Sequence, residues 1–508
     1  MIRNRGELAA ASHADSSPRT NSSPRALALD CVTAGVAAAR PRRVVREAVE
    51  LGDDGRTLTV SGESYDLADY EEVVVLGGGK AAAGVADALD SILGERVSDL
   101  RGAVVTDDPG DSPGRIDALA GDHPVPSERG VSAARRVLAL ADEATADTLI
   151  LAVVTGGGSA LLPAPAEGIS LADLQATTTD LLESGATIGE INAVRKHCSA
   201  LKGGRLAERA APATVVGLAL SDVVGDDLGT IASGPLSPDE TTYRDALGVL
   251  DRYGIDAPAA VRERLERGRR GEVPETPKPG HPAFERVSVH VLADGMTALR
   301  AAAEVADDAG YAPLVLSSRV RGEAREAAAT HAAVAEEIRA TGNPVEPPAV
   351  VLSGGETTVT VRGDGEGGPN LEFALSWALE LDAGDAAGAD AEASAPVVLA
   401  SVDTDGRDGG TDVAGALVDA ATVGRASGES GNEGEPGEPT DRGRESADAA
   451  ASADGRLSPT AARDALADND ALCPLADANC AIRTGPTGTN VNDLRVMVVA
   501  DGGRDTDL

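Results

Sequence analysis

Two glycine-rich turns carry residue types that bind anions. The first lies within VVVLGGGKAAAGVADAL, residues 73–89, where Lys80 directly follows Gly77, Gly78 and Gly79. Glycines let a backbone approach an anion, a helix N-terminus offers unpaired N–H groups, and the lysine ammonium adds a full charge. The spacing is not that of a Walker A loop, nor a convincing GxGxxG dinucleotide fingerprint. We predict a phosphate-binding turn, with a tight structural turn and a solvated lysine as the alternative.

The second turn follows another apolar run, in LAVVTGGGSALLPAP at residues 151–165. It contains Gly156, Gly157 and Gly158, followed by Ser159. Two such turns at the carboxyl ends of two strands would form a ligand crevice in an open α/β sheet. We therefore predict that both turns contact a nucleotide, whereas the alternative is a structural repeat of one turn.

A dense group of cations lies in GEINAVRKHCSALKGGRLA, residues 189–207. Its polar members are Asn192, Arg195, Lys196, His197, Lys202 and Arg205. This density is unusual in a chain with a net charge of −38. A guanidinium such as that of Arg195 can hold a carboxylate or a phosphate through two parallel hydrogen bonds. The alternative is a solvated helix face that pairs with nearby acids.

Carboxylates end a further strand candidate in LALSDVVGDDLGTIASGP, residues 218–235. They belong to Asp222, Asp226 and Asp227. One or two carboxylates commonly hold Mg²⁺, with phosphate oxygens completing its ligand shell. The alternative is that these aspartates only form turns.

A second acidic group follows an apolar run in ASVDTDGRDGGTDVAGALVD, residues 400–419. Asp403, Asp405 and Asp408 resemble a calcium-binding loop only superficially, because the EF-hand glutamate and its helices are missing. The stretch TGPTGTNVNDL, residues 484–494, begins with a Gly/Thr-rich turn at 484–490 that is able to bind a phosphate or a hydroxy acid. A plain turn is the simpler interpretation of either segment taken alone.

The elements that must position these residues follow an α/β pattern. Short apolar runs alternate with Ala/Leu-rich amphipathic stretches, as in buried parallel strands joined by crossover helices. We predict an N-terminal α/β domain over residues 26–270, a proline-rich linker over 271–284 and a C-terminal α/β domain over 285–508. Residues 1–25, rich in Ser, Arg, Asn and Pro, are predicted to be a flexible tail. Residues 426–455 contain almost no large apolar side chain and are predicted to be a disordered insertion.

Composition excludes several classes of function. With 83 acidic and 45 basic residues the net charge is −38, the opposite of a nucleic-acid-binding protein. The four cysteines show no CxxC spacing, which argues against a disulfide framework and a cysteine metal site. No run approaches about 18 apolar residues and no signal-peptide core is present, so we expect no membrane association and a cytoplasmic location. We interpret the acidic, lysine-poor composition as adaptation to concentrated salt, typical of a halophilic archaeon, with an ordinary acidic enzyme as the alternative.

Taken together, these segments resemble the type 2 glycerate kinases, whose C-terminal half is called the MOFRL domain. The resemblance covers about residues 26–499. It rests on nine segments in one order: GGGKAA, GDHPVPSERG, TGGGSALLPAP, NAVRKHCSALKGGRLA, SDVVGDDLGTIASGP, RGEAREAA, SGGETTV, DTDGRDGGTD and TGPTGTNVNDL. It implies a Rossmann-like α/β/α domain, a smaller C-terminal α/β domain and an active site in the cleft between them. It also implies ATP, a divalent cation such as Mg²⁺, D-glycerate as substrate and 2-phosphoglycerate as product, and it leaves a homo-oligomer open.

Residue roles follow from the resemblance by position. Lys80 matches the family's motif lysine, Asp222 its SDV aspartate, Asp403 and Asp405 its DTDG acids, and Arg195 with Lys196 its NxVRKH segment. We assign catalytic roles to Lys80, Asp222, Arg195 and Asp403. We assign cofactor contacts to Gly77, Gly78, Gly79, Gly156, Gly157, Gly158, Ser159 and Lys196. Metal binding is assigned to Asp226 and Asp405.

The chain departs from the family pattern in one motif. Where the family often has GGRNQE, residues 367–372 read GGPNLE, so that Pro369 replaces the arginine and Leu371 the glutamine. If the arginine binds phosphate, another cation must replace it, and Arg407 in the DTDG loop is the candidate.

Phosphoryl transfer depends mainly on positioning and charge neutralisation. In the predicted mechanism Lys80 contacts the transferred phosphate, and Asp222 or a DTDG carboxylate orients the glycerate hydroxyl or holds Mg²⁺. Arg195 holds the glycerate carboxylate or a phosphate. The rivals are an oxidoreductase of the hydroxypyruvate reductase type, for which we find no dinucleotide fingerprint, and a non-catalytic binder of sugar acids.

Overall fold

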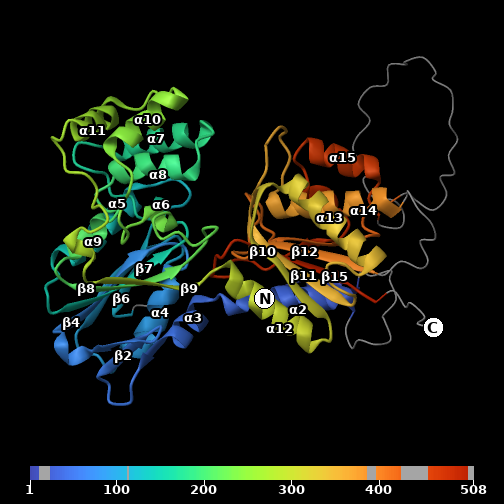
Figure 1. The fold of residues 1–508 in the computed structure, drawn as a ribbon, viewed down its shortest axis with the longest axis horizontal. Helices are drawn as coiled ribbons and strands as arrows, with labels where there is room; N and C mark the ends of the chain where they lie inside the picture. The colour runs from blue at the N-terminus through green and yellow to red at the C-terminus, as the bar shows by residue number, and fades with distance from the viewer. Residues whose placement is uncertain (11–22, 111–113, 386–395, 425–455, 502–508) are drawn as a thin grey trace. The chain divides into compact units, whose positions relative to one another are not determined.

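The computed structural model describes residues 1–10, 23–110, 114–385, 396–424 and 456–501, which fold into two compact units (Figure 1). The parallel-sheet unit comprises Ala39–Asp294 and Gly488–Val491. The mixed-sheet unit comprises Met1–Ala38, Gly295–Thr487 and Asn492–Leu508. Each unit has its own six-stranded sheet and its own buried core, and each is described separately below.

The parallel-sheet unit is built on six parallel strands. They are β4 (Glu72–Gly78), β5 (Leu100–Thr106), β6 (Ile116–Ala120), β7 (Thr148–Thr155), β8 (Thr214–Leu220) and β9 (Val287–Ala293). Their order across the sheet is β6-β5-β4-β7-β8-β9, and every neighbouring pair is parallel. Numbered along the chain this is 3-2-1-4-5-6, the doubly wound Rossmann order, whose switch point lies between β4 and β7. All eight residues of β7 are buried, as expected for a strand covered on both faces.

Helices cover both faces of this sheet. The helices of this unit are α3 (Pro41–Ala48), α4 (Ala82–Leu93), α5 (Glu128–Asp142), α6 (Gly158–Leu161), α7 (Leu171–Glu183), α8 (Ile188–His197), α9 (Arg205–Ala210), α10 (Tyr243–Tyr253) and α11 (Ala259–Arg269). Alternate residues of β4, Val74 and Leu76, share a core with α5 and α9. Helices α7, α8, α10 and α11 form a separate cluster around the buried Tyr243 and Leu181, seen as a group in Figure 1.

Short elements complete this unit. An antiparallel sheet is formed by β1 (Val49–Leu51), β2 (Thr57–Val60) and β3 (Glu63–Asp66). Single 3₁₀ turns lie at η1 (Leu67–Asp69), η2 (Ile231–Ser233) and η3 (Pro282–Phe284).

The mixed-sheet unit also has six strands, but only one pair is parallel. The strands are β10 (Ala312–Glu323), β11 (Ala349–Thr358), β12 (Val397–Asp403), β13 (Gly415–Asp419), β14 (Ala481–Ile482) and β15 (Asp493–Val499). Their order is β10-β11-β15-β12-β13-β14, with β10 and β11 parallel and the other pairs antiparallel. β15, the last strand in the chain, is inserted in the middle of the sheet and buried throughout.

Helices lie on both faces of the mixed sheet. One face carries α13 (Ala324–Thr341), α14 (Pro369–Asp385), α15 (Pro459–Ala467) and α16 (Leu472–Asp477). The other carries α2 (Pro24–Ala38) and α12 (Gly295–Asp308), while α1 (Arg5–Ala10) packs against α2 (Figure 1). The predicted α/β fold, with one sheet covered by helices in each of two units, is therefore confirmed.

The boundaries of the units differ from the predicted domains in two places. The boundary falls at Asp294, after the predicted linker at 271–284, because β9 pairs in register with β8, with Val287 opposite Val215. Helix α2, predicted in the N-terminal domain, belongs to the mixed-sheet unit. Its Gly35 packs so closely that an added Cβ would lie 2.6 Å from Leu494 Cδ2.

The predicted flexible segments are only partly described. Within residues 1–25, Arg5–Ala10 form α1, and Leu8 is fully buried where Arg25 Nε donates to its carbonyl oxygen over 2.8 Å. Residues 11–22 and the predicted insertion at 426–455 lie outside the described residues.

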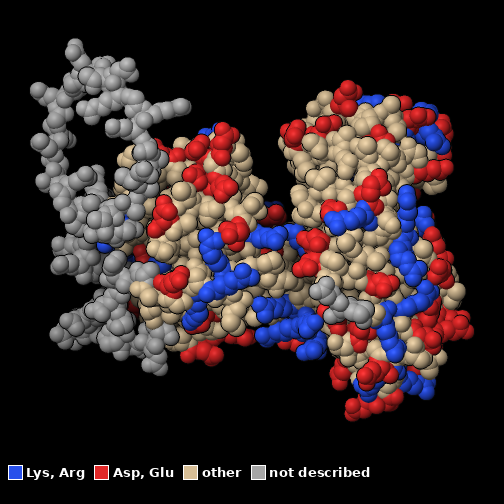
Figure 2. Space-filling view, turned by 180° about the vertical axis from the view of Figure 1, so that it is seen from behind, with Lys and Arg blue, Asp and Glu red and all other residues tan. Residues whose placement is uncertain are grey.

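Charged side chains of both signs cover the surface. Figure 2 shows, on one face, acidic side chains spread over each unit with lysine and arginine side chains among them. Among the residues described, no helix is long and apolar enough to cross a membrane. The interpretation as salt adaptation stays a prediction.

Candidate active site

The two predicted glycine turns meet at the switch point of the parallel sheet. The backbone N–H of Lys80, after β4, donates to the carbonyl oxygen of Gly156, after β7, over 2.8 Å. The N–H of Ala81 donates to Thr155 Oγ1 over 3.2 Å. These bonds fasten the two turns to each other where doubly wound folds bind their ligands.

The three glycines before Lys80 are needed by the sheet itself. A Cβ on Gly77 would lie 2.0 Å from the carbonyl oxygen of Val153, and one on Gly79 would lie 2.1 Å from Thr155 Oγ1. Both glycines have φ well above zero, +129° and +138°, which side-chain-bearing residues rarely adopt. Gly78 is similarly close to a backbone oxygen of β5. Packing between strands thus explains all three glycines, and the predicted contact of Gly77, Gly78 and Gly79 with a cofactor stays a prediction.

The glycines after β7 have a different environment, because functional side chains surround them. A Cβ on Gly156 would lie 2.0 Å from Asp222 Oδ2, at the end of β8. One on Gly157 would lie 3.0 Å from Lys80 Cγ and 3.2 Å from His123 Cδ2, in the loop after β6. The sheet therefore gathers a lysine, a histidine and an aspartate around one turn.

Gly158, the third glycine of this turn, packs against the TIASGP loop. Its added Cβ would lie 2.7 Å from Ala232 Cβ. Its predicted contact with a cofactor, like those of Gly156 and Gly157, stays a prediction.

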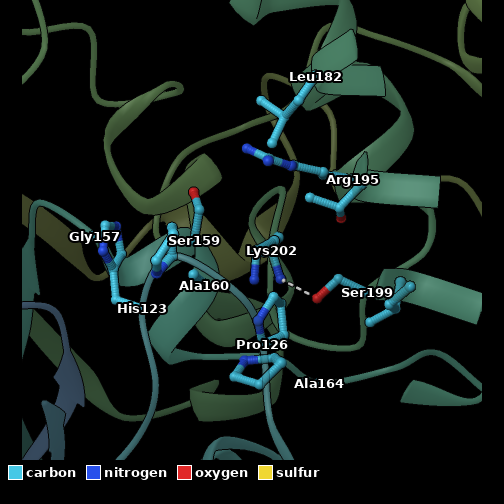
Figure 3. A pocket seen from close by; sticks show the side chains of 14 residues that line it. His123, Pro126, Gly157, Ser159, Ala160, Ala164, Leu182, Arg195, Ser199 and Lys202 are labelled. Carbon is cyan, nitrogen blue, oxygen red and sulfur yellow. Dashed lines mark hydrogen bonds between the residues drawn. The ribbon is translucent and has the colours of Figure 1, made fainter. Parts of the chain in front are cut away.

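A pocket of about 220 Å³ opens beside this turn. Its lining comes from the loop after β6, the turn after β7, α7, α8 and the segment after α8 (Figure 3). The polar groups among the lining residues are His123, Ser159, Thr178, Arg195, Ser199 and Lys202. Lys80 and Asp222 do not line the pocket themselves, but they contact the turn that forms its wall.

Arg195 extends into the pocket from the last turn of α8, where a cation is favoured by the helix dipole. The helix is fixed at its start by a capping box between Thr187 and Glu190, and Tyr253 donates to Glu190 Oε2 over 2.9 Å. Within the described part of the chain the Arg195 guanidinium has neither a hydrogen bond nor an ion pair, and burial lowers its pKa. An unpaired, partly buried guanidinium that faces a cavity is suited to bind an anion.

Lys202 lies deeper in the pocket wall and was not assigned a role from the sequence. Its Nζ donates to the carbonyl oxygen of Leu162 over 2.8 Å, and the residue is buried. Burial, with a smaller contribution from Arg195, lowers the pKa of Lys202 to about 7. Ser199 Oγ accepts from the N–H groups of Leu201 and Lys202, which orders the turn that carries the lysine (Figure 3). The pocket therefore contains a second cation whose charge depends on pH near neutrality.

Ser159 is tied to two residues outside the glycine turn. Its Oγ lies 2.7 Å from Ser233 Oγ, and Ser233 Oγ donates to Asn192 Oδ1 over 2.9 Å. Ser233 belongs to the TIASGP loop, whose backbone accepts hydrogen bonds from Gly203 and Gly204, just after Lys202. This chain of hydroxyls connects the turn after β7 with α8.

Lys196, predicted to contact the cofactor, is occupied elsewhere. Its Nζ lies 3.2 Å from Asp239 Oδ1, with side chains 9% and 0% exposed. Thr241 and Thr276 hydroxyls complete the carboxylate's hydrogen bonds. Lys196 therefore forms a buried ion pair and does not line the pocket, in contrast to its neighbour Arg195. The sequence could not separate the two, because adjacent helical residues point about 100° apart.

The predicted metal ligands belong to different units, Asp226 to the parallel-sheet unit and Asp405 to the mixed-sheet unit. Asp226 lies in the loop after β8 with φ +58°, and Asp227 caps the following turn by accepting from the Gly229 N–H. Across the described residues, no group of three or more His, Cys, Asp and Glu side chains has an arrangement that could hold a metal ion.

The DTDG acids lie in the mixed-sheet unit, at the end of β12. Asp403 Oδ1 accepts from the Asp405 N–H over 2.9 Å. Burial and the neighbouring carboxylates of Asp405 and Asp493 raise the pKa of Asp403 well above its usual range. The crowded negative charge is of the kind that a bound cation would relieve.

The GGPNLE motif, which differs from the family's usual GGRNQE, lies at the start of α14. The carboxylate of Asp408 caps this helix by accepting from the N–H groups of Asn370 and Leu371 over 2.9 and 2.8 Å. Arg407, the candidate replacement cation, has an exposed side chain. Arg495 is a buried cation of the same unit that packs against α14, with its guanidinium 4.4 Å from the ring centroid of Phe373.

Comparison with known proteins identifies the family. The model described as a domain of unknown function (DUF4147) matches residues 27–266, and the MOFRL family model matches residues 349–435. D-glycerate 2-kinase from Thermotoga maritima is 36% identical over 462 residues, covering 90% of this chain and 97% of its own length. The chain belongs to the glycerate 2-kinase family. It is a kinase.

Two further relatives of this kinase differ in their names. A crystal structure of glycerate kinase from Thermotoga maritima superposes with a TM-score of 0.72 at 35% identity, covering 93% of this chain and 99% of that one. A protein named "Putative hydroxypyruvate reductase" from Agrobacterium vitis is 41% identical over 429 residues, covering 84% of this chain and 87% of its own. Family membership thus agrees with the predicted resemblance. Because this relative is named a hydroxypyruvate reductase, the oxidoreductase is still considered as an alternative below.

Three residues of this kinase had no role assigned from the sequence: His123 and Lys202, which line the pocket, and Ser233, whose hydroxyl contacts the pocket residue Ser159. His123 stands in the GDHP segment, Lys202 in the KGGR segment and Ser233 in TIASGP. Each segment had been recognised as part of the resemblance. What the sequence lacked was the order of the strands, which brings the loops after β6, β7 and β8 together.

Proposed function

We propose that this kinase transfers the γ-phosphoryl group of ATP to the 2-hydroxyl of D-glycerate, giving 2-phosphoglycerate and ADP. The observation that carries the proposal is the Arg195 guanidinium, which faces a small pocket without a partner in the described residues, next to the turn that gathers Lys80 and Asp222. A pocket of about 220 Å³ is smaller than the range usual for drug-sized ligands and suits a short organic acid.

Each side chain has a distinct role in the proposed reaction. Arg195 binds the carboxylate of glycerate through a charge-assisted hydrogen bond. Asp222 accepts the proton of the 2-hydroxyl as its oxygen forms the new bond to phosphorus. The bond between the γ-phosphorus and the bridging oxygen breaks, and Lys80 offsets the negative charge on the transferred group. Lys202 adds positive charge to the pocket when it is protonated.

A divalent cation fits the residues at the end of β12. Mg²⁺ is usually held by one or two carboxylates together with phosphate oxygens and water, so that two acids are enough. Asp403 and Asp405 offer this pair, and burial together with the neighbouring carboxylates of Asp405 and Asp493 raises the pKa of Asp403. We propose these two residues as the holders. The cation would supply charge neutralisation to the phosphates.

An oxidoreductase acting on hydroxypyruvate is the second candidate, because two relatives bear that name and the strand order is that of dinucleotide-binding folds. One observation weakens it. The glycines after β4 accommodate the backbone of β5 and β7, whereas a dinucleotide fingerprint needs a glycine free for close approach to the pyrophosphate.

A coupled assay separates the candidates. Purified protein with ATP, MgCl₂ and D-glycerate should release ADP, and phosphorus NMR should show 2-phosphoglycerate. Oxidation of NADH or NADPH with hydroxypyruvate, without ADP release, would establish the oxidoreductase instead. A 3-phosphoglycerate signal would contradict the proposed position of transfer, and no turnover in either assay would favour a binding protein.

A further inference from the structure

The direction of the hydrogen bonds around Ser159 determines what this pocket residue can recognise. A serine hydroxyl has one proton to donate and two lone pairs that accept. Ser233 gives its proton to Asn192 Oδ1, over 2.9 Å. The 2.7 Å contact between the two serine oxygens then requires Ser159 to donate and Ser233 to accept. Ser159 therefore has only lone pairs left for the pocket.

An acceptor at this position discriminates between ligand groups. Figure 3 shows the Ser159 oxygen on the side of the pocket that the Arg195 guanidinium faces. A phosphate or carboxylate oxygen also presents lone pairs, so it would meet Ser159 unfavourably. A ligand hydroxyl would donate to Ser159 while a neighbouring carboxylate binds Arg195. If the predicted contact of Ser159 with the cofactor involved a phosphate, it would not suit this geometry.

The backbone holds Ser233 in place by a strained conformation. Ala232 and Ser233 have φ of +50° and +62°, followed by Gly234 at +63°, and Ser233 is fully buried. Left-handed backbone at non-glycine residues costs free energy and persists where its surroundings require it. Here the carbonyl oxygens of Ser233 and Gly234 accept from Gly203 and Gly204 over 3.0 and 2.7 Å. These bonds fix the serine that takes the proton of Ser159.

We infer that Ser159 accepts a hydrogen bond from the glycerate hydroxyl that is not phosphorylated, and so selects acids that carry this second hydroxyl. The inference rests on the proposed function. In that function Arg195 binds the carboxylate and Asp222 receives the proton of the reacting hydroxyl. The remaining hydroxyl is then the one donor of the substrate without a partner. Ser233 contacts Ser159, and Asn192 contacts Ser233, so both act as positioning residues that do not touch the substrate.

Two analogues of D-glycerate test the inference through binding to the whole chain, independently of turnover. D-lactate replaces the second hydroxyl by hydrogen, and D-3-fluorolactate replaces it by fluorine, which cannot donate. Dissociation constants from NMR titration should be about tenfold weaker for lactate than for glycerate, since one hydrogen bond is lost. Fluorolactate should bind still more weakly, because its fluorine faces an acceptor.

Substitutions separate Ser159 from a general effect on the pocket. Ser159→Ala should weaken glycerate binding about tenfold and change the dissociation constant of lactate by less than threefold. The preference for glycerate over lactate then disappears. Ser233→Ala releases the Ser159 proton, and fluorolactate should then bind about as well as lactate. Ser91→Ala, on α4 away from the pocket, is the matched control and should keep the wild-type order. Melting temperatures confirm that each variant is folded.

The outcomes distinguish this inference from the proposed function. Equal weakening of glycerate and lactate by Ser159→Ala would overturn the role of Ser159, as would equal binding of glycerate and fluorolactate to the wild type. Absence of ADP release with glycerate would instead overturn the kinase reaction proposed above. The glycerate preference measured by titration would still support recognition of the second hydroxyl.

Discussion

Gly156 lies directly against the carboxylate of Asp222, so that a Cβ on Gly156 would come 2.0 Å from Asp222 Oδ2. The turn after β7 and the end of β8 are thus in contact at the position where the proposed reaction needs a base. Gly156→Ala should push this carboxylate aside and lower kcat about 10²-fold, the scale expected for a displacement of about 1 Å. Steady-state kinetics with ATP and glycerate measure the effect.

The matched control for this substitution is Gly248→Ala in α10. An added Cβ there meets nothing within 4 Å and the residue is helical, so activity should be unchanged and the melting temperature slightly higher. If Gly156→Ala retained wild-type kcat in a folded protein, Asp222 would have no catalytic role.

Lys80 should be the most sensitive single position of the site. Lys80→Met keeps much of the stem but removes the charge, and loss of one electrostatic contact to the transition state costs about 10²–10³ in kcat. Lys80→Arg should also be poor, since a planar guanidinium does not reproduce a compact ammonium beside Gly157. A folded Lys80→Met variant with kcat within about threefold of wild type would argue for a purely structural turn.

The sequence predicted the α/β fold and the two glycine-rich turns because these depend on local pattern. Apolar runs that end in glycines were sufficient to place the turns after β4 and β7 at strand ends. Which glycines face a ligand depends on the neighbouring strands, and only the strand order shows that Gly77 is packed against Val153. Local pattern could therefore propose the turns but not divide their residues between packing and binding.

The remaining differences between the predicted and the observed structure arise from contacts between distant residues. The apolar run at β9 resembles any strand, and its pairing with β8 assigns it to the parallel sheet. Asp239 lies 43 residues from Lys196, so its ion pair could not be predicted from the cationic segment alone. Both cases concern residues far apart in the sequence, whose contacts produce no periodic pattern from which they could be predicted.

Arg195 and Lys196 are adjacent in α8 and should respond oppositely to the same substitution. Arg195→Met removes an unpaired cation at the pocket, so KM for glycerate should rise about 10–100-fold with an unchanged or higher melting temperature. Lys196→Met leaves the fully buried Asp239 without its cation and should destabilise the protein by about 3–5 kcal/mol. Kinetics and denaturant unfolding on both variants test the pair, and the reverse pattern would contradict the assignment of the pocket.

Salt should stabilise the protein and raise its activity. At a net charge of −38, repulsion among carboxylates opposes the compact state until ions screen it. Thermal unfolding and kinase assays from dilute buffer to molar KCl measure the trend. An activity that is highest in dilute buffer and lost in molar KCl would contradict the interpretation as salt adaptation.

Glycerate binding should weaken as pH rises through about 7, because Lys202 then loses its charge. Burial and, to a smaller extent, Arg195 lower the pKa of this amine to about 7, from 10.5 in the unfolded chain. The protonated amine adds a positive charge to a pocket that already holds Arg195, so KM for the glycerate anion should be lowest below pH 7 and rise above it.

The same titration has a defined effect on stability. Between pH 7 and 10.5 the unfolded chain binds the Lys202 proton and the folded chain does not, so this group makes unfolding less favourable as pH rises across that window. Burial raises the pKa of Asp408 to about 7, so the folded chain binds this proton below pH 7 where the unfolded chain has already lost it. Asp408 therefore makes unfolding more favourable as pH rises towards 7, a pH range that does not overlap with that of Lys202.

Lys202→Met should flatten both the KM profile around pH 7 and the stability profile above it. His123 lines the same pocket, so a KM profile that kept its pH dependence in Lys202→Met and lost it in His123→Gln would transfer the effect to the histidine.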